Sequence, residues 1–178
     1  MGQLLLLRHA KSSWDDPGLS DHSRPLNRRG RLAALALREA IVGLGLKPEL
    51  VLVSTSRRTL QTLQALEPWE TPPVVEPQDG LYLASAGAIL DAIHAAPPGT
   101  QSILVVGHNP GLHELAFQLA GSPDAAAEHA DARRLADAYP SGALAEFTWP
   151  GAWADAPAGV RLVRFICPRD LPEPAEAT

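Results

Sequence analysis

Short apolar runs, each long enough for one buried strand, are the feature that most constrains the fold of this chain. Three of them read LLLL at 4–7, LVLV at 50–53 and ILVV at 103–106. Between such runs, apolar residues recur at the i, i+3, i+4, i+7 spacing of an amphipathic helix. The strand-then-helix order occurs four times along the chain. This alternation predicts an α/β protein whose helices pack on a mostly parallel sheet.

The predicted elements follow from this periodicity and from the glycines and prolines that interrupt it. Strands are predicted over 3–8, 49–54, 73–76, 102–107, 143–149 and 160–166. Helices are predicted over 28–43, 58–66, 86–95, 111–120 and 124–137. The last two strands are joined by a turn rich in Gly, Ala and Pro, which predicts an antiparallel hairpin. We therefore expect a three-layer α/β/α sandwich around a mostly parallel, mixed sheet of about six strands.

The size of the chain favours one domain. With 178 residues, 46% of them apolar, it can bury an ordinary core. We predict a single domain over 1–171. The sequence ends in the acidic, proline-rich stretch PRDLPEPAEAT, and we expect 172–178 to be a disordered tail.

Charge and cysteine content exclude several classes of function. The formal net charge is −5 and the basic residues are scattered, which argues against a nucleic-acid-binding protein. Cys167 is the only cysteine, so an internal disulfide and a CxxC metal site are both excluded. No apolar run is long enough for a signal peptide or a bilayer span. We expect a cytoplasmic protein without a membrane partner, and its oligomeric state cannot be read from the sequence.

Polar and cationic residues follow three of the apolar runs directly. Because the carboxyl ends of neighbouring strands in an open α/β sheet meet at one crevice, these residues are expected to converge there. Helix N-termini at the same edge add amide donors and a positive dipole end. The sequence therefore predicts an anion pocket that contains two histidines. The residues concerned are Arg8, His9, Ser54, Arg57, Arg58 and His108.

Such a pocket suits phosphoryl transfer, in which catalysis is mostly positioning and electrostatic stabilisation. Arginine offers a permanently charged fork for two phosphoryl oxygens. An imidazole attacks phosphorus only when neutral, and nearby arginines disfavour its protonation, so His9 is the candidate nucleophile. His108, protonated against a bound dianion, is the candidate stabiliser of the transition state. This scheme requires neither a metal nor a cofactor.

Seven segments together resemble the short phosphohistidine phosphatases of the SixA type, in the histidine phosphatase (phosphoglycerate mutase-like) superfamily. The resemblance extends from about residue 3 to 171 and is carried by LLLLRHAKSSW, SRPLNRRG, LVLVSTSRRTLQT, LYLAS, ILVVGHNPGLHELA, YPSGALAEF and FICPRDL. It implies that His9 becomes phosphorylated and that Arg8, Arg58 and His108 bind the phosphoryl group. Arg24 of SRPLN is expected to join them.

The serine-arginine segment departs from the usual family pattern at one position. A proline usually follows the serine, and here Thr55 replaces it. The family arginine comes four residues after the serine, which selects Arg58 and leaves Arg57 outside the motif. Ser54 is a further candidate donor to phosphate.

The general acid of the larger mutases and acid phosphatases has no convincing counterpart in this sequence. Glu76 and Asp79 are the nearest candidates, because they directly precede Leu81-Tyr82. A phosphoramidate such as phosphohistidine needs less help from an acid, since its imidazole can leave as an already protonated, neutral species. The resemblance thus favours phosphorylated protein as the substrate, with small phosphorylated molecules as the alternative.

Other interpretations remain open at this point. The chain could be a small-molecule phosphomonoesterase or mutase of the same superfamily, or a non-catalytic module that binds phosphoproteins. A mononuclear metal site built from His9 and His108 is a remote alternative, because no Asp or Glu ligand stands beside either residue. Arg28, Arg29 and Arg31 lie in the first turn of a predicted helix, where the dipole does not favour them. They form either a basic rim for an acidic protein or, as the simpler interpretation, a solvated face.

Overall fold

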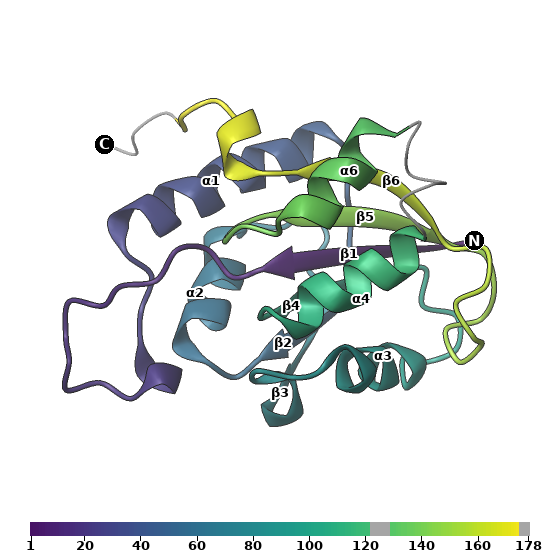
Figure 1. Cartoon of the computed structure of the whole chain (residues 1–178), viewed down its shortest axis with the longest axis horizontal. Helices are drawn as coiled ribbons and strands as arrows, with labels where there is room; N and C mark the ends of the chain where they lie inside the picture. The colour runs from purple at the N-terminus through teal and green to yellow at the C-terminus, as the bar shows by residue number, and fades with distance from the viewer. Residues whose placement is uncertain (122–128, 175–178) are drawn as a thin grey trace.

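The sheet of the computed structural model, which describes residues 1–121 and 129–174, has six strands in the order β3-β2-β4-β1-β5-β6 (Figure 1). The strands are β1 Gly2–Arg8, β2 Leu50–Ser54, β3 Val74–Gln78, β4 Ser102–Gly107, β5 Leu144–Trp149 and β6 Arg161–Ile166. The pairs β1–β4, β2–β4 and β2–β3 are parallel, whereas β5 pairs antiparallel with both β1 and β6. The predicted mixed sheet and its C-terminal hairpin are confirmed.

Helices cover both faces of this sheet, which confirms the three-layer arrangement (Figure 1). One face packs against α3, α4 and α6, and the other against α1 and α2. The helices are α1 Arg28–Gly43, α2 Arg57–Ala65, α3 Ala86–His94, α4 Gly111–Ala120 and α6 Ala130–Asp137. The predicted helix 124–137 corresponds to α6 in its second half, and 122–128 lie outside the described residues.

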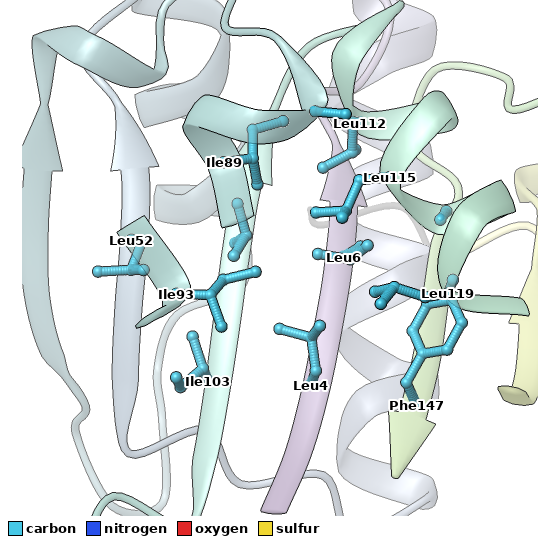
Figure 2. Packing of buried hydrophobic residues seen from close by; sticks show 14 of the residues in the cluster. Leu4, Leu6, Leu52, Ile89, Ile93, Ile103, Leu112, Leu115, Leu119 and Phe147 are labelled. Carbon is cyan, nitrogen blue, oxygen red and sulfur yellow. The ribbon is translucent and has the colours of Figure 1, made fainter. Parts of the chain in front are cut away.

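The leucine run of β1 is apolar throughout because both faces of the strand are buried. Successive strand residues point to opposite faces, so Leu4 and Leu6 join the core under α3 and α4. Leu5 and Leu7 join the core under α1 and α2. Figure 2 shows the first of these cores, with Ile89 and the side chains of α4 turned toward Leu4 and Leu6. Complete burial of one such leucine contributes about 1.5–3 kcal/mol to the stability of the fold.

Side-chain caps define where the helices before the site begin. Asn27 Oδ1 accepts a hydrogen bond from the Gly30 N–H (2.8 Å) at the start of α1, and asparagine is a favoured residue at this position. The Ser85 side chain caps α3 by accepting from the Ala88 N–H (3.2 Å). The Ser56 side chain caps α2 and thereby fixes the first turn, which carries two arginines.

Three short 3-10 helices have no counterpart in the prediction. They are η1 Asp21–Ser23, η2 Asp79–Leu81 and η3 Pro168–Asp170. The stretch that begins PRDL is therefore ordered at its start, where the Cys167 N–H donates to Asp170 Oδ2 (2.8 Å). The expected disorder of 172–178 stays a prediction, since 175–178 are not described. Within the described residues, no helix is long and apolar enough to cross a membrane.

Candidate active site

The strand order brings the predicted site residues together. β1 and β2 both flank β4, so the carboxyl ends of these three strands lie side by side. The rings of His9, after β1, and His108, after β4, have centroids 5.3 Å apart. They line a pocket of about 290 Å³. The other lining residues are Arg8, Lys11, Ser12, Trp14, Arg24, Arg58, Leu83, Asn109 and Ser141.

The His9 ring is held in one tautomer. Its Nδ1 lies 2.7 Å from the carbonyl oxygen of Ala10, which can only accept, so Nδ1 carries the proton and Nε2 keeps its lone pair. Burial and then the charges of Arg58, Arg8 and Arg24 together lower the pKa of His9 to about 4, against the opposing effect of the Ala10 hydrogen bond. At neutral pH, His9 is therefore an uncharged imidazole with a free Nε2 in the pocket.

His108 is held by partners on both ring nitrogens. Its Nδ1 lies 3.5 Å from Nη2 of Arg58, and because a guanidinium can only donate, this nitrogen accepts. The proton is thus on Nε2, which donates to Ser54 Oγ at 2.8 Å. Burial, followed by the effects of His9 and Arg58, lowers the pKa of His108 to about 3. Ser54 therefore orients His108 from behind and does not line the pocket itself.

Asp21, at the start of η1, holds two pocket arginines in place. Arg58 donates through Nη1 to the Asp21 carbonyl oxygen (2.6 Å) and through Nη2 to Oδ2 (2.9 Å). Arg24 donates through Nη1 to Oδ1 (2.9 Å), and the Tyr82 hydroxyl also donates to the carboxylate. The Tyr82 hydrogen bond, followed by those of Arg24 and Arg58, holds the pKa of Asp21 far below its usual range. Asp21 is thus a permanent anion that fixes the planes of two guanidinium groups.

Arg8 and Arg24 complete the cationic wall of the pocket. Arg8 donates through Nη1 to the Tyr139 carbonyl (3.0 Å), whereas its Nε is buried with no hydrogen-bond partner among the described residues. A buried donor without a partner is unusual and suits an anionic ligand. Arg24 stacks on Trp14, with Cζ 3.2 Å from the ring centroid.

Two residues of the segment TLQT lock the loops around the pocket, and their role could not be read from the sequence. Thr62 Oγ1 accepts from the N–H of Ala10 (2.9 Å), the residue whose carbonyl orients His9. Gln61 Oε1 accepts from the Leu26 N–H (2.8 Å), next to the loop that carries Arg24. α2 therefore supplies Arg58 and also positions both loops that face it.

The two candidate general acids lie elsewhere. Glu76 is on the edge strand β3, in register with Leu52, and Asp79 accepts a hydrogen bond from Thr55 Oγ1 (2.7 Å) on the exposed surface. Neither lines the pocket, and none of the lining residues carries a carboxyl group. In the part of the chain that the structure describes, no group of three or more His, Cys, Asp or Glu residues could hold a metal ion.

Fold and pocket together define a class of protein: an α/β sandwich with a pocket at one end of the sheet that is lined by two imidazoles and three guanidinium groups. Residues 4–81 match the model of the histidine phosphatase superfamily, branch 1. An uncharacterized protein of Mycobacterium tuberculosis is 35% identical over 170 residues, which cover 92% of this chain and all of that protein.

Solved structures extend this similarity to the SixA type. A structure from Nakamurella multipartitia, described as a candidate phosphohistidine phosphatase SixA, is 31% identical with a TM-score of 0.81. The match covers 94% of this chain and 96% of that one. A second candidate SixA, from Agrobacterium tumefaciens, is 28% identical with a TM-score of 0.79, over 93% and 97% of the two chains. This chain belongs to the histidine phosphatase superfamily as a SixA-type member, and its activity is that of a phosphatase.

Proposed function

We propose that this chain is a metal-independent phosphohistidine phosphatase that uses His9 as its nucleophile. The observation that carries the proposal is the state of His9, whose Nδ1–H is bound to the Ala10 carbonyl and whose pKa is lowered to about 4. A neutral imidazole with a free Nε2 next to Arg8, Arg24 and Arg58 is the arrangement that in-line attack on a phosphoryl dianion requires.

The reaction proceeds in two transfers. In the first, the Nε2 lone pair of His9 forms a bond to phosphorus while the phosphorus–nitrogen bond of the substrate breaks, and the substrate imidazole leaves with the bond electrons. If that imidazole carries a proton on its other nitrogen, it departs as a neutral molecule. In the second transfer, water attacks the phosphoryl group on His9, its proton is released to phosphate or solvent, and inorganic phosphate leaves. The three arginines bind the equatorial oxygens in both steps.

None of the described residues that line the pocket carries a carboxyl group, and this supports protein phosphohistidine as the substrate class. An alkoxide leaving group must be protonated as it departs, and the carboxylate nearest the pocket arginines, Asp21, is ionised and already shared by Arg24 and Arg58. A phosphoramidate has no such need. Aryl phosphates, whose phenolate is a good leaving group, are expected as slower surrogates, and alkyl esters such as phosphoglycerates as poor ones.

The test offers the purified protein a histidine-phosphorylated peptide, an aryl phosphate and a phosphoglycerate, all with a chelator present. We expect turnover in that order of preference, and loss of turnover in His9→Ala. Brief reaction with radiolabelled phosphopeptide is expected to label wild-type protein with a phosphate that is stable to base and labile to acid. Undiminished turnover by His9→Ala, or activity that returns only when a divalent metal is added, would contradict the proposal.

A further inference from the structure

A groove of about 950 Å³ opens beside the active-site pocket. Both cavities are lined by Arg8, Lys11 and Ser141, so the groove continues directly from the phosphoryl site. One wall is the first part of α1, and the opposite wall is formed by the end of α6, η3 and residues 171–174. In Figure 1 the yellow segment that contains η3 lies next to α1. The groove is far larger than a single phosphoryl group requires.

The groove is positively charged although the chain as a whole carries −5. Among the described residues that line it, two carry carboxylates, Asp137 and Glu173. Six cationic residues line the groove against these two carboxylates, and Arg134 among them is ion-paired with Asp131 and Asp170. The cationic lining residues are Arg8, Lys11, Arg28, Arg29, Arg134 and Arg169. This charge complements an acidic ligand.

The position of Arg29 indicates that the positive charge of the groove does more than keep the helix surface solvated. It is exposed in the first turn of α1, together with Arg28, and that turn contains no acidic residue. The helix dipole disfavours cations there, so their placement costs a little stability. An anion between the two walls would offset that cost. The location in the groove therefore favours the basic-rim interpretation over the solvated face that the sequence suggested.

Both walls are fixed relative to His9. A Cβ on Gly30 would meet the Lys11 carbonyl oxygen at 2.1 Å, and the Asn27 N–H donates to the same oxygen (3.0 Å), so α1 rests directly on the segment after His9. On the other side, the Gly142 N–H donates to the His9 carbonyl (3.0 Å), and a Cβ on Gly142 would lie 3.1 Å from Pro168 at the start of η3. The groove therefore has a fixed position relative to His9, and so has a ligand that binds in it.

We propose that this groove binds an acidic segment of the phosphorylated protein, adjacent in sequence to its phosphohistidine. The inference rests on the proposed function and extends it to the recognition of the substrate. Carboxylates of the segment pair with Arg29 and Arg169 on opposite walls, and its apolar side chains lie on Leu32 and Ala36 between them. Small phosphoesters reach only the inner pocket, so their turnover is independent of the groove.

The test compares two double variants that change the net charge equally. Arg29→Glu with Arg169→Glu reverses both walls of the groove, whereas Arg133→Glu with Arg161→Glu reverses two exposed arginines outside it. The probes are a phosphohistidine peptide flanked by Glu and Leu, the same peptide with Lys in place of Glu, and an aryl phosphate. For the acidic peptide, we expect kcat/KM to fall on the order of tenfold in the groove variant and to stay within about twofold in the control. Both variants are expected to turn over aryl phosphate like the wild type.

Binding of the unphosphorylated acidic peptide, followed by fluorescence anisotropy, separates this inference from the proposed function. If neither peptide nor aryl phosphate is turned over, the proposed function fails, and weaker binding to the groove variant than to the control still supports the groove. Equal kcat/KM for the acidic and lysine peptides, or equal loss in the two double variants, overturns the groove. Circular dichroism checks that both variants are folded.

Discussion

Two adjacent arginines show how sharply the surroundings of one residue decide its role. Arg58 is 3% exposed and reaches the pocket, where Asp21 holds both of its terminal nitrogens. Arg57 is exposed outside the pocket, with Nη1 at 3.5 Å from the Ser23 carbonyl. The family resemblance selects Arg58, which stands four residues after Ser54, and the first turn of α2 directs the two side chains to different sides.

Replacement of these arginines therefore has unequal effects. We expect Arg58→Ala to lower kcat/KM for aryl phosphate on the order of a hundredfold or more, since a preorganised donor to the transferred phosphoryl group is lost. Arg58→Lys is expected to rescue little, because an ammonium cannot reproduce the planar fork. The matched control is Arg57→Ala, expected within about twofold of wild type. Steady-state kinetics measure these effects. Similar losses of kcat/KM in Arg58→Ala and Arg57→Ala would contradict the assignment of Arg58 as the arginine that binds the phosphoryl group.

The two pocket histidines are predicted to be opposite tautomers. The Ala10 carbonyl places the proton of His9 on Nδ1, and the Arg58 guanidinium places that of His108 on Nε2. Long-range proton–nitrogen correlation spectra at neutral pH should show both patterns, assigned with His9→Gln and His108→Gln. Inorganic phosphate should then protonate His108, because the dianion raises its pKa. A protonated ring, or an Nε2–H tautomer at His9, in the ligand-free protein would refute this picture.

The sequence did not predict the residues whose partners lie far away along the chain. Asp21 stands three positions before Arg24 in a loop without periodicity, and its contacts with Arg58 and Tyr82 cross wide stretches of the chain. Glu76 and Asp79 were selected by their proximity to Leu81-Tyr82, but the edge position of β3 and the contact with Thr55 keep them out of the pocket lining. Strand ends were predictable because apolar runs mark them, whereas loop contacts leave no such mark.

At the scale of elements, the strands and long helices could be predicted, and their spatial order could not. The runs of β1, β2 and β4 are apolar on both faces because helices cover both. Nothing local indicates that β4 lies between β1 and β2, since that pairing joins residues far apart in sequence. The three 3-10 helices are each three residues long, too short for any periodic pattern. One of them carries Asp21, so part of the site depended on an element that had no sequence signal.

The two ends of α1 provide a matched test of how this helix supports the site. A Cβ on Gly30 would meet the Lys11 carbonyl oxygen at 2.1 Å, whereas a Cβ on Gly43 would meet nothing within 4 Å. We expect Gly30→Ala to destabilise the fold by about 1–3 kcal/mol and to lower activity, because α1 must move away from the segment after His9. Gly43→Ala should be neutral or stabilising by up to about 1 kcal/mol. Urea denaturation measures the free energy of unfolding of both variants. Equal stabilities of Gly30→Ala and Gly43→Ala would exclude the close approach of Gly30 to the Lys11 carbonyl.

At the scale of the whole molecule, the site makes the fold sensitive to acid. The protein buries two histidines in a neutral form, with the pKa of His9 lowered to about 4 and that of His108 to about 3 from an ordinary value of 6.5. Between these values the unfolded chain binds more protons than the folded one, so the free energy of unfolding rises with pH in this range. The depressed pKa of Asp21 adds a loss of stability only as the pH falls below about 4, at the acid end of the range in which the histidines act.

Stability is therefore predicted to fall between about pH 8 and about pH 5, by roughly 2 kcal/mol for each buried histidine. Urea denaturation in phosphate-free buffer measures this change, because a bound anion would stabilise the folded state on its own. His9→Gln and His108→Gln each remove one titrating group, so each variant should lose less stability over the same range than the wild type. Addition of inorganic phosphate should reduce the acid sensitivity of the wild type by favouring protonated His108 in the folded state. If the wild type and both variants show the same pH dependence, the histidines are not buried as neutral rings, and the nucleophile assigned to His9 loses its physical basis.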